Sequence, residues 1–454
     1  MKLLIIGGSD AGISAALRAR ELDRETEITV LLADDFPNYS ICGLPFYLSG
    51  ETQDWRSLAH RTEFEGIDIR RGHRATRINT VAKTVDVSTE GAASLTFRYD
   101  KLVIGTGAGP VEPPIEGSRY PGVFLLHTMQ DSFDVHRYLE TAKPQRAVIV
   151  GAGYIGLEMA DALTHRGIEV TIASRTTTVL ATVDAEFGKS VSEELQRHGV
   201  KVYTSVEVDR IARAGDQLHV SGSSHFEQDC EMVLIAVGVK PHATLGADAG
   251  LDIGIKGALA VNRKMESKLP DIYVAGDCAE TFHRLLNRHT YLPLGTTAHK
   301  QGRVAAENAL GGNREFAGSL GTQVVKIFGL VIARTGLRHH EALRESFHPF
   351  TAESTANDHK AYYPGATQLR TRVTGNTETG RLLGAQIMGR WGTEVSKRLD
   401  IFATAIFHGM SVDQISDLDL SYTPPLSSPW DPVQMACQNW CSKLEMIAAE
   451  EVTA

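Results

Sequence analysis

The chain has 454 residues, of which 42% are hydrophobic and 22% are charged, a balance that is typical of a globular protein. Its net charge of −9 argues against nucleic acid or an anionic membrane as the main partner, and no apolar run approaches the ~20 residues that span a bilayer. The opening MKLLIIGG is too short for a signal peptide, and five cysteines without an export signal indicate reduced thiols. We therefore expect a cytoplasmic protein in which any disulfide chemistry is catalytic.

The first element is an apolar run and a glycine turn, KLLIIGGSDAGISAALRARE, typical of a strand that turns sharply into a helix. Such a turn can hold a phosphate at the helix N-terminus, because small residues let the backbone come close. Ser9 replaces the second glycine of the G-x-G-x-x-G pattern, so an ordinary turn is the competing interpretation. After the next strand, EITVLLADDF, a carboxylate could accept hydrogen bonds from a ribose. The predicted dinucleotide-binding residues here are Gly7, Gly8, Ser9, Asp10, Ala11, Gly12 and Asp34.

The next stretch, PNYSICGLPFYLSG, places Cys42 just before a plausible helix start with a proline in its first turn. A thiolate is the nucleophile in disulfide exchange, and a nearby helix N-terminus or cation would lower the thiol pKa. No second cysteine lies close by, so the redox partner of Cys42 would be a small thiol or an oxygen atom. A buried structural cysteine is the competing interpretation.

The segment RAVIVGAGYIGLEMADALTHRG repeats the strand–turn–helix arrangement with the complete pattern at Gly151, Gly153 and Gly156. Two such turns in one chain are far more specific than one. The strand end that follows, EVTIASRTTT, offers Ser174 and Arg175 and no acid. Because an arginine pairs with a 2′-phosphate and a carboxylate repels it, we predict NADPH over NADH, with NADH possible. A solvated loop arginine is the alternative.

Four further stretches could complete the two nucleotide sites. YDKLVIGTGAGPVEPPI and LPDIYVAGDCAE are strands that end in glycine turns, and CEMVLIAVGVKP is a third short strand. In PLGTTAHKQGRVAAENAL we expect a helix that starts at Thr296 or Thr297, with the positive end of its dipole facing an electron-rich ring. The predicted binding residues in these stretches are Thr106, Gly107, Ala108, Gly238, Gly276, Asp277, Thr296, Thr297 and Ala298.

The C-terminal part contains two segments with a strand pattern, TQVVKIFGLVIARTGL and LRTRVTGNTETGRLLGAQIMG, followed by apolar residues at helical spacing in TEVSKRLDIFATAIFHGMSVDQI. Cys437 and Cys441 would share one face of a later helix. A packed helix is favoured over a thiol relay to a partner's active site. No histidine or cysteine spacing predicts a metal site.

Together these motifs identify a resemblance. The first glycine turn, SICGLPFYLSG, YDKLVIGTGA, GAGYIGLEMA, IYVAGDCAE, AYYPGATQL and DLSYTPPLSSPWDPV resemble the FAD-dependent pyridine nucleotide–disulfide oxidoreductases over nearly the whole chain. The match is closest to the single-cysteine branch, which contains coenzyme A disulfide reductase, persulfide reductase, and NADH oxidase and peroxidase. The resemblance implies an α/β fold with two Rossmann-like domains, for FAD and NAD(P), and a C-terminal α+β dimerisation domain. The expected segments are 1–110 (FAD, first part), 111–145 (connector), 146–245 (NAD(P)), 246–322 (FAD, second part) and 323–454 (dimerisation).

The resemblance also implies roles for particular residues. Hydride would pass from NAD(P)H to FAD, and the electrons would pass on to Cys42. Tyr362 and Tyr422 would come from the partner subunit of a homodimer with shared active sites and donate a hydrogen bond or proton to a leaving thiolate. Aromatic packing at an interface is the alternative for both tyrosines. Residues in the second glycine turn that would contact the nucleotide are Tyr154, Ile155 and Glu158.

Two positions bear on the substrate. Peroxidases and oxidases of this branch carry a histidine at the position of Asp10, so the carboxylate counts against peroxide. Glu21 stands where some coenzyme A users have a phosphate-binding arginine, which puts coenzyme A in doubt. We expect a reductase of small-molecule disulfides or persulfides, similar to coenzyme A disulfide reductase. The alternatives are an NAD(P)H oxidase or peroxidase that uses a Cys42 sulfenate, and an electron-transfer flavoprotein in which Cys42 is incidental.

Overall fold

The computed structural model describes residues 1–59, 61–91 and 94–453. Its N-terminal unit is built on a parallel sheet with strand order β18-β7-β1-β2-β3. These strands are short and largely buried, as expected for a parallel sheet covered on its faces. Their bounds are Lys2–Ile6 (β1), Glu27–Leu31 (β2), Ile67–Arg70 (β3), Lys101–Ile104 (β7) and Ile272–Val274 (β18).

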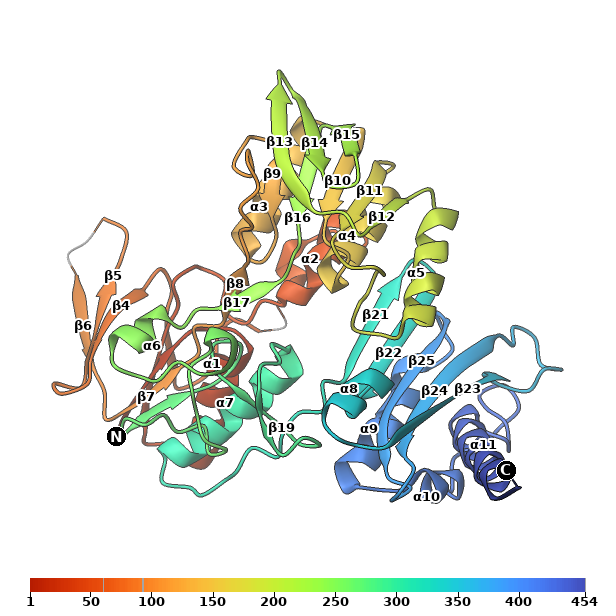
Figure 1. The fold of residues 1–454 in the computed structure, drawn as a ribbon. Coiled ribbons are helices and arrows are strands. Elements are labelled where there is room, and N and C mark those ends of the chain that lie inside the picture. Colours follow the sequence, from red (N-terminus) through yellow and green to blue (C-terminus); the bar gives the residue numbers. More distant parts are fainter. Residues whose placement is uncertain (60, 92–93, 454) are drawn as a thin grey trace.

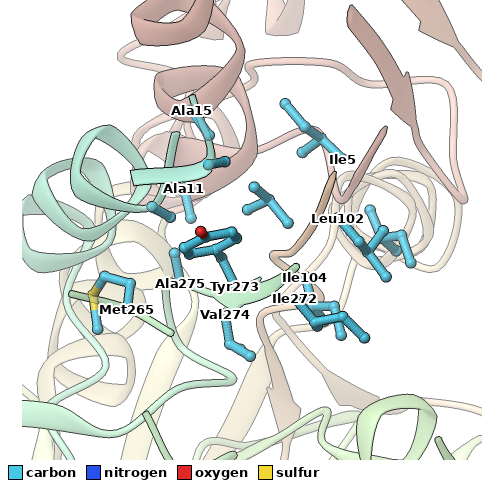
Figure 2. Packing of buried hydrophobic residues seen from close by; sticks show 14 of the residues in the cluster. Ile5, Ala11, Ala15, Leu102, Ile104, Met265, Ile272, Tyr273, Val274 and Ala275 are labelled. Atoms are coloured by element: carbon cyan, nitrogen blue, oxygen red, sulfur yellow. The ribbon is translucent and has the colours of Figure 1, made fainter. Parts of the chain in front are cut away.

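Two helices that are far apart in sequence, α1 (Asp10–Leu22) and α7 (Gly295–Ala309), pack against each other beside this sheet (Figure 1). Figure 2 shows part of the core, where Ile5 of β1 and Tyr273 of β18 lie on the face of the sheet that is turned towards Ala11 of α1. The alanine methyl is small enough to let the helix lie close to the sheet. The smaller elements of this unit are β4 (Arg74–Asn79), β5 (Thr84–Ser88), β6 (Leu95–Arg98), α6 (Thr244–Asp248), η3 (Ile255–Gly257), β19 (Thr281–His283) and β20 (Arg288–Thr290).

The second unit repeats this architecture with strand order β12-β11-β10-β16-β9, again parallel. A two-stranded ribbon of β8 (Ala108–Pro110) and β17 (Val239–Pro241) connects it to the first unit. Its strands are β9 (Val123–Leu125), β10 (Arg146–Val150), β11 (Glu169–Ser174), β12 (Lys201–Thr204), β13 (Val208–Ala214), β14 (Gln217–Gly222), β15 (Phe226–Cys230) and β16 (Met232–Ile235). Its helices are α3 (Met129–Thr141), α4 (Tyr154–His165) and α5 (Ala185–Arg197).

The C-terminal unit is an antiparallel sheet with strand order β21-β22-β25-β24-β23 and four helices. Figure 1 places α11 and the C-terminus against the β23 and β24 end of this sheet. The strands are β21 (Gln323–Ile327), β22 (Leu330–Gly336), β23 (Pro349–Asn357), β24 (Gln368–Asn376) and β25 (Leu382–Arg390). The helices are α8 (His339–Arg344), α9 (Val395–His408), α10 (Val412–Ser416) and α11 (Pro432–Thr453). The predicted fold class is therefore confirmed.

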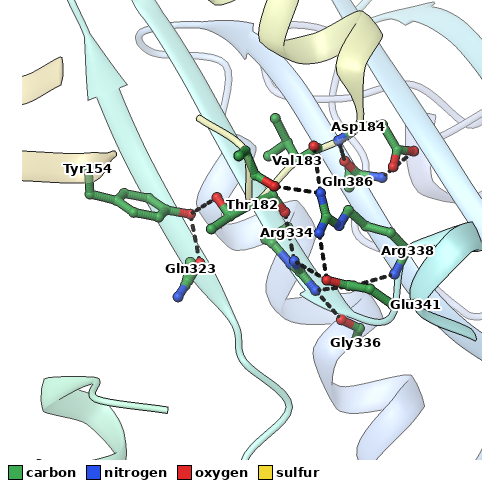
Figure 3. A network of polar contacts seen from close by, with 11 residues as sticks. Tyr154, Thr182, Val183, Asp184, Gln323, Arg334, Gly336, Arg338, Glu341 and Gln386 are labelled. Carbon is green, nitrogen blue, oxygen red and sulfur yellow. Dashed lines mark hydrogen bonds and ion pairs between the residues drawn. The ribbon is translucent and has the colours of Figure 1, made fainter. Parts of the chain in front are cut away.

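A network of hydrogen bonds and ion pairs connects the second unit to the C-terminal sheet (Figure 3). Arg334 of β22 donates to the carbonyl oxygen of Thr182 at 2.6 Å, and Arg338 donates to that of Val183 at 2.8 Å. Glu341 accepts from both arginines, at 3.0 Å and 2.7 Å. Burial would raise the pKa of Glu341, but the hydrogen bond from Arg338 and the charge of Arg334 lower it to about 2. The two arginines thus join the units through these carbonyl oxygens, and the ionised Glu341 carboxylate holds both arginines in place.

Three local expectations differ from the structure. Strand β23 was not predicted, because its sequence mixes polar and apolar residues along an edge strand that is only partly buried. The segment TEVSKRLDIFATAIFHGMSVDQI, whose apolar residues have helical spacing, forms two helices, α9 and α10, since Gly409 ends α9 in the left-handed conformation with a φ of 69°. Helix α7 begins at Gly295, one residue before the predicted start.

Candidate active site

The first glycine turn connects β1 to α1 where only glycine fits. An ideal Cβ at Gly12 would lie 1.9 Å from the carbonyl oxygen of Gly7, whose own φ is +107°. Helix α1 can therefore begin directly at the carboxyl end of the strand, where its first N–H groups are available to an anion. Ser9 occupies the N-cap position but makes no capping hydrogen bond with its side chain. The predicted turn is formed. Ser9, which replaces the second glycine of the pattern, is exposed and has an extended backbone conformation.

The second glycine turn has the same geometry between β10 and α4. An ideal Cβ at Gly156 would lie 2.2 Å from the carbonyl oxygen of Gly151, and Gly153 has open space around it. Ile155 lies beside it in the first turn of α4. The Tyr154 hydroxyl donates to Gln323 Oε1 at 2.8 Å. The Tyr154 side chain thus also joins the second unit to β21.

The two strand ends differ as the sequence predicts. Asp34 is exposed after β2, and its carboxylate accepts a hydrogen bond from the Phe36 N–H at 2.9 Å. Ser174 is buried at the end of β11, and the Arg175 side chain is 83% exposed with its nearest carboxylate, Glu207, at 3.9 Å. Arg175 therefore makes only a weak ion pair and is accessible to a phosphate.

Cys42 lies in the short 3-10 helix η1 (Ile41–Gly43), directly before α2 (Leu44–Ser49). The preceding segment runs beside the first glycine turn, since the Asn38 N–H donates to the carbonyl oxygen of Gly8 at 2.8 Å. Cys42 is exposed, and among the described residues no cysteine forms a disulfide. Cys42 therefore lies at the surface beside the first glycine turn.

The electrostatics of Cys42 differ from the sequence-based expectation. Although the residue is exposed, protein atoms crowd its thiol, so desolvation raises the thiol pKa, and the carboxylates of Asp10, Glu158 and Asp277 raise it further. The expected lowering by a helix N-terminus is wrong for the protein alone, because α2 has only six residues while desolvation and the charges of three carboxylates raise the thiol pKa. These carboxylates come from three distant parts of the sequence.

Asp10 and Asp277 both lie near the start of α7, and their charges interact. An ideal Cβ at Gly295 would lie 2.8 Å from Asp10 Oδ2, so the carboxylate occupies the space above the first residue of the helix. Burial and then the charge of Asp10 raise the pKa of Asp277 to about 6. Burial also raises the pKa of Asp10, against the charge of His299. His299 was not predicted as a site residue, because only the packing of α1 on α7 brings it here.

The other predicted binding residues lie near strand ends and at the start of α7. Gly276 adopts a φ of +84° directly after β18, and Gly107 a φ of +70° after β7. The hydroxyl of Thr106 donates to the carbonyl oxygen of His242 at 2.7 Å. In the first turn of α7, the hydroxyl of Thr297 lies 3.2 Å from that of Ser319. The remaining predicted positions are Ala108 in β8, Gly238 in the β16–β17 turn, and Thr296 and Ala298 in the first turn of α7.

Glu158 lies on α4 where the three units meet. Burial and then the charge of Asp161 raise the pKa of Glu158 to about 7, against the positive charge of Lys326. Lys326, from β21, lies 3.5 Å from Asp161 Oδ2 and 4.0 Å from Glu51 Oε1. Lys326 was also missed, because nothing in its local sequence distinguishes it from a surface lysine.

The two predicted catalytic tyrosines lie together, but not beside Cys42. Tyr362 is in the loop between β23 and β24 and Tyr422 is in the loop before α11, both on the far side of the C-terminal unit from α2 (Figure 1). Desolvation, then the charge and hydrogen bond of Tyr422, raise the pKa of the Tyr362 phenol. Both residues are exposed, at 73% and 45%. Within one subunit, therefore, the tyrosine pair is separate from the thiol.

The remaining cysteines and charges can be placed briefly. Cys437 is buried and Cys441 half-buried on α11, as a packed helix requires.

Glu21 forms ion pairs with Arg18 at 3.0 Å and with Arg303 at 3.1 Å. Within 1–59, 61–91 and 94–453, no group of three or more His, Cys, Asp or Glu side chains could hold a metal ion. Of the helices in those ranges, none is long and apolar enough to cross a membrane.

Comparison with known proteins gives matches over the whole length. Residues 1–302 match the family described as pyridine nucleotide-disulphide oxidoreductase, and residues 322–432 match its dimerisation domain. The chain is 34% identical to an NAD(P)H sulfur oxidoreductase (CoA-dependent) of Pyrococcus furiosus, over 95% of this chain and 97% of the relative. It is 31% identical to an NADH oxidase of Methanocaldococcus jannaschii, over 98% and 99%. The solved structure of an NAD-dependent persulfide reductase from A. fulgidus superimposes with a TM-score of 0.94 at 34% identity, covering 98% of this chain and 84% of that one.

Proposed function

This chain belongs to the pyridine nucleotide-disulphide oxidoreductase family, an FAD-dependent NAD(P)H oxidoreductase, and on that premise we propose that it reduces a small-molecule disulfide or persulfide through Cys42. The observation that carries the proposal is that Cys42 is exposed beside the first glycine turn and forms no disulfide with another described cysteine. A single thiol in this place can exchange with a small disulfide but cannot close an internal one.

The residues fit FAD at the first glycine turn. The turn leaves a cradle that a Cβ at Gly12 would close, at the carboxyl ends of β1 and β7. FAD, when bound, takes a hydride from NAD(P)H and passes the electron pair on. In our assignment the backbone of residues 7–12 holds the pyrophosphate, Asp34 accepts from the ribose hydroxyls and Asp277 accepts from a further ligand hydroxyl.

We assign the second glycine turn to NADPH, with NADH as a weaker donor. Gly151, Gly153 and Gly156 bring the backbone close to the pyrophosphate, and the exposed Arg175 meets the 2′-phosphate. Relative kcat/KM values for the two nucleotides test this assignment. A wild-type enzyme that prefers NADH, with the same preference in Arg175→Ala, would contradict the assignment.

The chemistry at Cys42 balances with one nucleotide per disulfide. The Cys42 thiolate attacks one sulfur of the disulfide, so that a mixed disulfide forms and one thiolate leaves. The two electrons of one hydride then break the mixed disulfide, which restores the Cys42 thiolate and releases the second thiolate. Each leaving thiolate needs a proton, and Tyr362 and Tyr422 of the partner subunit are our candidates to supply it.

The tyrosine assignment requires a homodimer with shared active sites. A dimerisation domain is present, and the exposed tyrosine pair belongs to it. In Figure 1 the loop between β23 and β24, which contains Tyr362, lies far from α2, which directly follows Cys42, so the assignment needs a second copy to bring the tyrosines to the thiol. We further propose a cytoplasmic enzyme, with the segment bounds at about residues 110, 145, 245 and 322 given above.

We propose coenzyme A as the thiol of the substrate. Glu21 does not oppose this, because its charge is balanced by Arg18 and Arg303, which lie on α1 and α7. The intact mass of the purified protein, measured before and after mild reduction, tests the proposal. A reducible adduct with the mass of coenzyme A supports it, and an adduct of another thiol would replace coenzyme A as the substrate.

The second candidate is an NAD(P)H oxidase or peroxidase, which the similarity to an NADH oxidase favours. In that case Cys42 would carry a sulfenate, and the intact mass would show a single added oxygen. Rapid NADPH oxidation with oxygen and no disulfide would favour this candidate. Turnover that needs a disulfide or persulfide would exclude it as the main activity.

A further inference from the structure

The two loops that carry the tyrosine pair are held against each other. The first loop, residues 358–367, contains Tyr362, and the second, residues 417–431, contains Tyr422. The backbone N–H of Lys360 donates to the carbonyl oxygen of Pro424 at 3.3 Å. Two further contacts link the loops, the hydrogen bond between the two phenols and the Lys360 ammonium, which lies 4.9 Å from the centre of the Trp430 ring. All three are contacts between surface loops, and the backbone bond is long.

A single buried arginine bonds both loops from below. Arg398 lies on α9, is 6% exposed, and donates through Nη2 to the carbonyl oxygen of Asp358 at 2.6 Å. The same nitrogen lies 3.3 Å from the carbonyl oxygen of Leu426, and Nη1 donates to Asp431 Oδ2 at 2.9 Å. The guanidinium therefore connects the start of the first loop to two points of the second.

Each loop is also closed by its own buried aspartate. Asp358 accepts from the Thr367 N–H at 2.8 Å, which joins the two ends of the first loop. Asp431 accepts from the Ser427 hydroxyl at 2.7 Å and from the Val433 N–H at 2.8 Å. Both aspartates are 6% exposed. The loops are thus two separately closed units that Arg398 holds in register.

The fork of the guanidinium is needed for this arrangement. A lysine keeps the positive charge for Asp431, but its compact ammonium cannot match the planar set of donors that Arg398 directs to three acceptors. At least one loop would then lose its bond to α9, and the exposed phenols would no longer be held at a fixed separation. Charge alone does not replace Arg398.

We propose that Arg398 is a positioning residue for thiol release, which holds Tyr362 and Tyr422 as one proton-donating unit. The proposal rests on the proposed function, since it assumes that the tyrosines act at Cys42 of the partner subunit. It extends that function by assigning the spacing of the two phenols to Arg398 of α9 and its partner Asp431.

The experiment compares Arg398→Lys with the double variant Tyr362→Phe/Tyr422→Phe, and with the triple variant, all as flavin-loaded dimers. Two steps are measured separately: flavin reduction by NADPH without a disulfide, and steady-state thiol release. Because a positioned proton donor contributes about 10²-fold or more, Arg398→Lys should lower kcat for thiol release at least about tenfold. Flavin reduction and the KM for NADPH should stay within about twofold of the wild type.

A matched control separates positioning from general damage. Arg370 of β24 pairs with Glu353 Oε1 at 2.7 Å and bonds neither loop, so Arg370→Lys should leave both steps within about twofold of the wild type. In the tyrosine-free background, Arg398→Lys should cause less than about a twofold further loss. An equal loss in both backgrounds would overturn the proposal, because Arg398 would then act without the tyrosines.

The outcomes separate this inference from the proposed function. If the tyrosine double variant is slow and Arg398→Lys is not, the inference fails and the role of the tyrosines stands. If the tyrosine double variant is as fast as the wild type, the proposed proton donors fail, and the inference with them. If Arg398→Lys does not form a flavin-loaded dimer, Ser427→Ala is the milder variant, because it deletes only one hydrogen bond to Asp431. Thiol release by Ser427→Ala as fast as that of the wild type would then overturn the inference.

Discussion

Replacing Glu158 with glutamine should make the protein more stable near pH 8 and change its stability much less near pH 5. Burial raises the pKa of this carboxyl from 4.5 to about 7. The folded protein therefore binds this proton more tightly than the unfolded chain does. Its contribution to stability is complete below pH 4.5 and is lost as the pH rises to about 7.

The size of the effect follows from the same two values. At about 1.4 kcal/mol for each pH unit, a rise in pKa from 4.5 to about 7 makes the ionised carboxylate cost up to about 3 kcal/mol in the folded state. Glutamine has nearly the same shape and stays neutral, so Glu158→Gln should gain up to about 3 kcal/mol over the wild type at pH 8 and under about 1 kcal/mol at pH 5.

Urea unfolding of both proteins at a series of pH values, without added nucleotide, measures this difference. Lys326→Met serves as an internal control, because Lys326 lowers the pKa of Glu158 and its removal should raise that pKa further. A stability difference between wild type and Glu158→Gln that is the same at all pH values would refute the reasoning. It would mean that Glu158 is ionised in the folded protein as readily as in the unfolded chain.

Three further perturbations are expected to have specific results. Gly12→Ala should purify with little flavin, because the new Cβ would lie 1.9 Å from the carbonyl oxygen of Gly7; flavin absorbance per subunit measures this, and full occupancy would contradict it. Asp10→Asn should lower the pKa of the Cys42 thiol, whose pKa the Asp10 charge raises; the pH dependence of alkylation of the flavin-free protein measures this, and an unchanged midpoint would count against it. Glu341→Gln should cost up to about 3 kcal/mol of stability at pH 7, because the arginines stabilise only the ionised carboxylate. This loss should fade as the pH drops from 4.5 towards about 2. Urea midpoints across this range test the prediction, and a loss of stability that persists near pH 2 would argue against it.

The two strand–turn–helix glycine turns could be predicted from sequence because their constraints are local. Gly7 and Gly12, like Gly151 and Gly156, must be glycine because a strand, a sharp turn and a helix follow one another within a few residues. The resemblance to a family then supplied the position of Cys42 and the order of the units. Strand β23 escaped prediction because an edge strand that is partly exposed carries no clear alternation.

The electrostatics of the site could not be predicted in this way. Asp10, Glu158 and Asp277 come from α1, α4 and the turn after β18, and only the assembled fold places all three around Cys42. Lys326 is brought to Glu158 by the packing of β21 on α4. The thiol pKa therefore depends on tertiary contacts, and the local helix start gave the wrong sign.

The bond from Arg398 to both tyrosine loops was equally hidden. In sequence, Arg398 is one charged residue in an amphipathic helix, and its partners Asp358 and Asp431 lie on either side of it at distances that no local pattern connects. A buried arginine with all its acceptors in loops becomes evident only from the structure.

The most direct test of the account is a separation of the two half-reactions in Cys42→Ser. We predict that NADPH still reduces the bound flavin at the rate of the wild type, while reduction of a coenzyme A disulfide falls to background. Loss of flavin reduction would show that the substitution damages the nucleotide site and would leave disulfide turnover uninformative for that variant. Full disulfide turnover by Cys42→Ser would contradict the account, because electrons would then reach the substrate without the exposed thiol beside the first glycine turn.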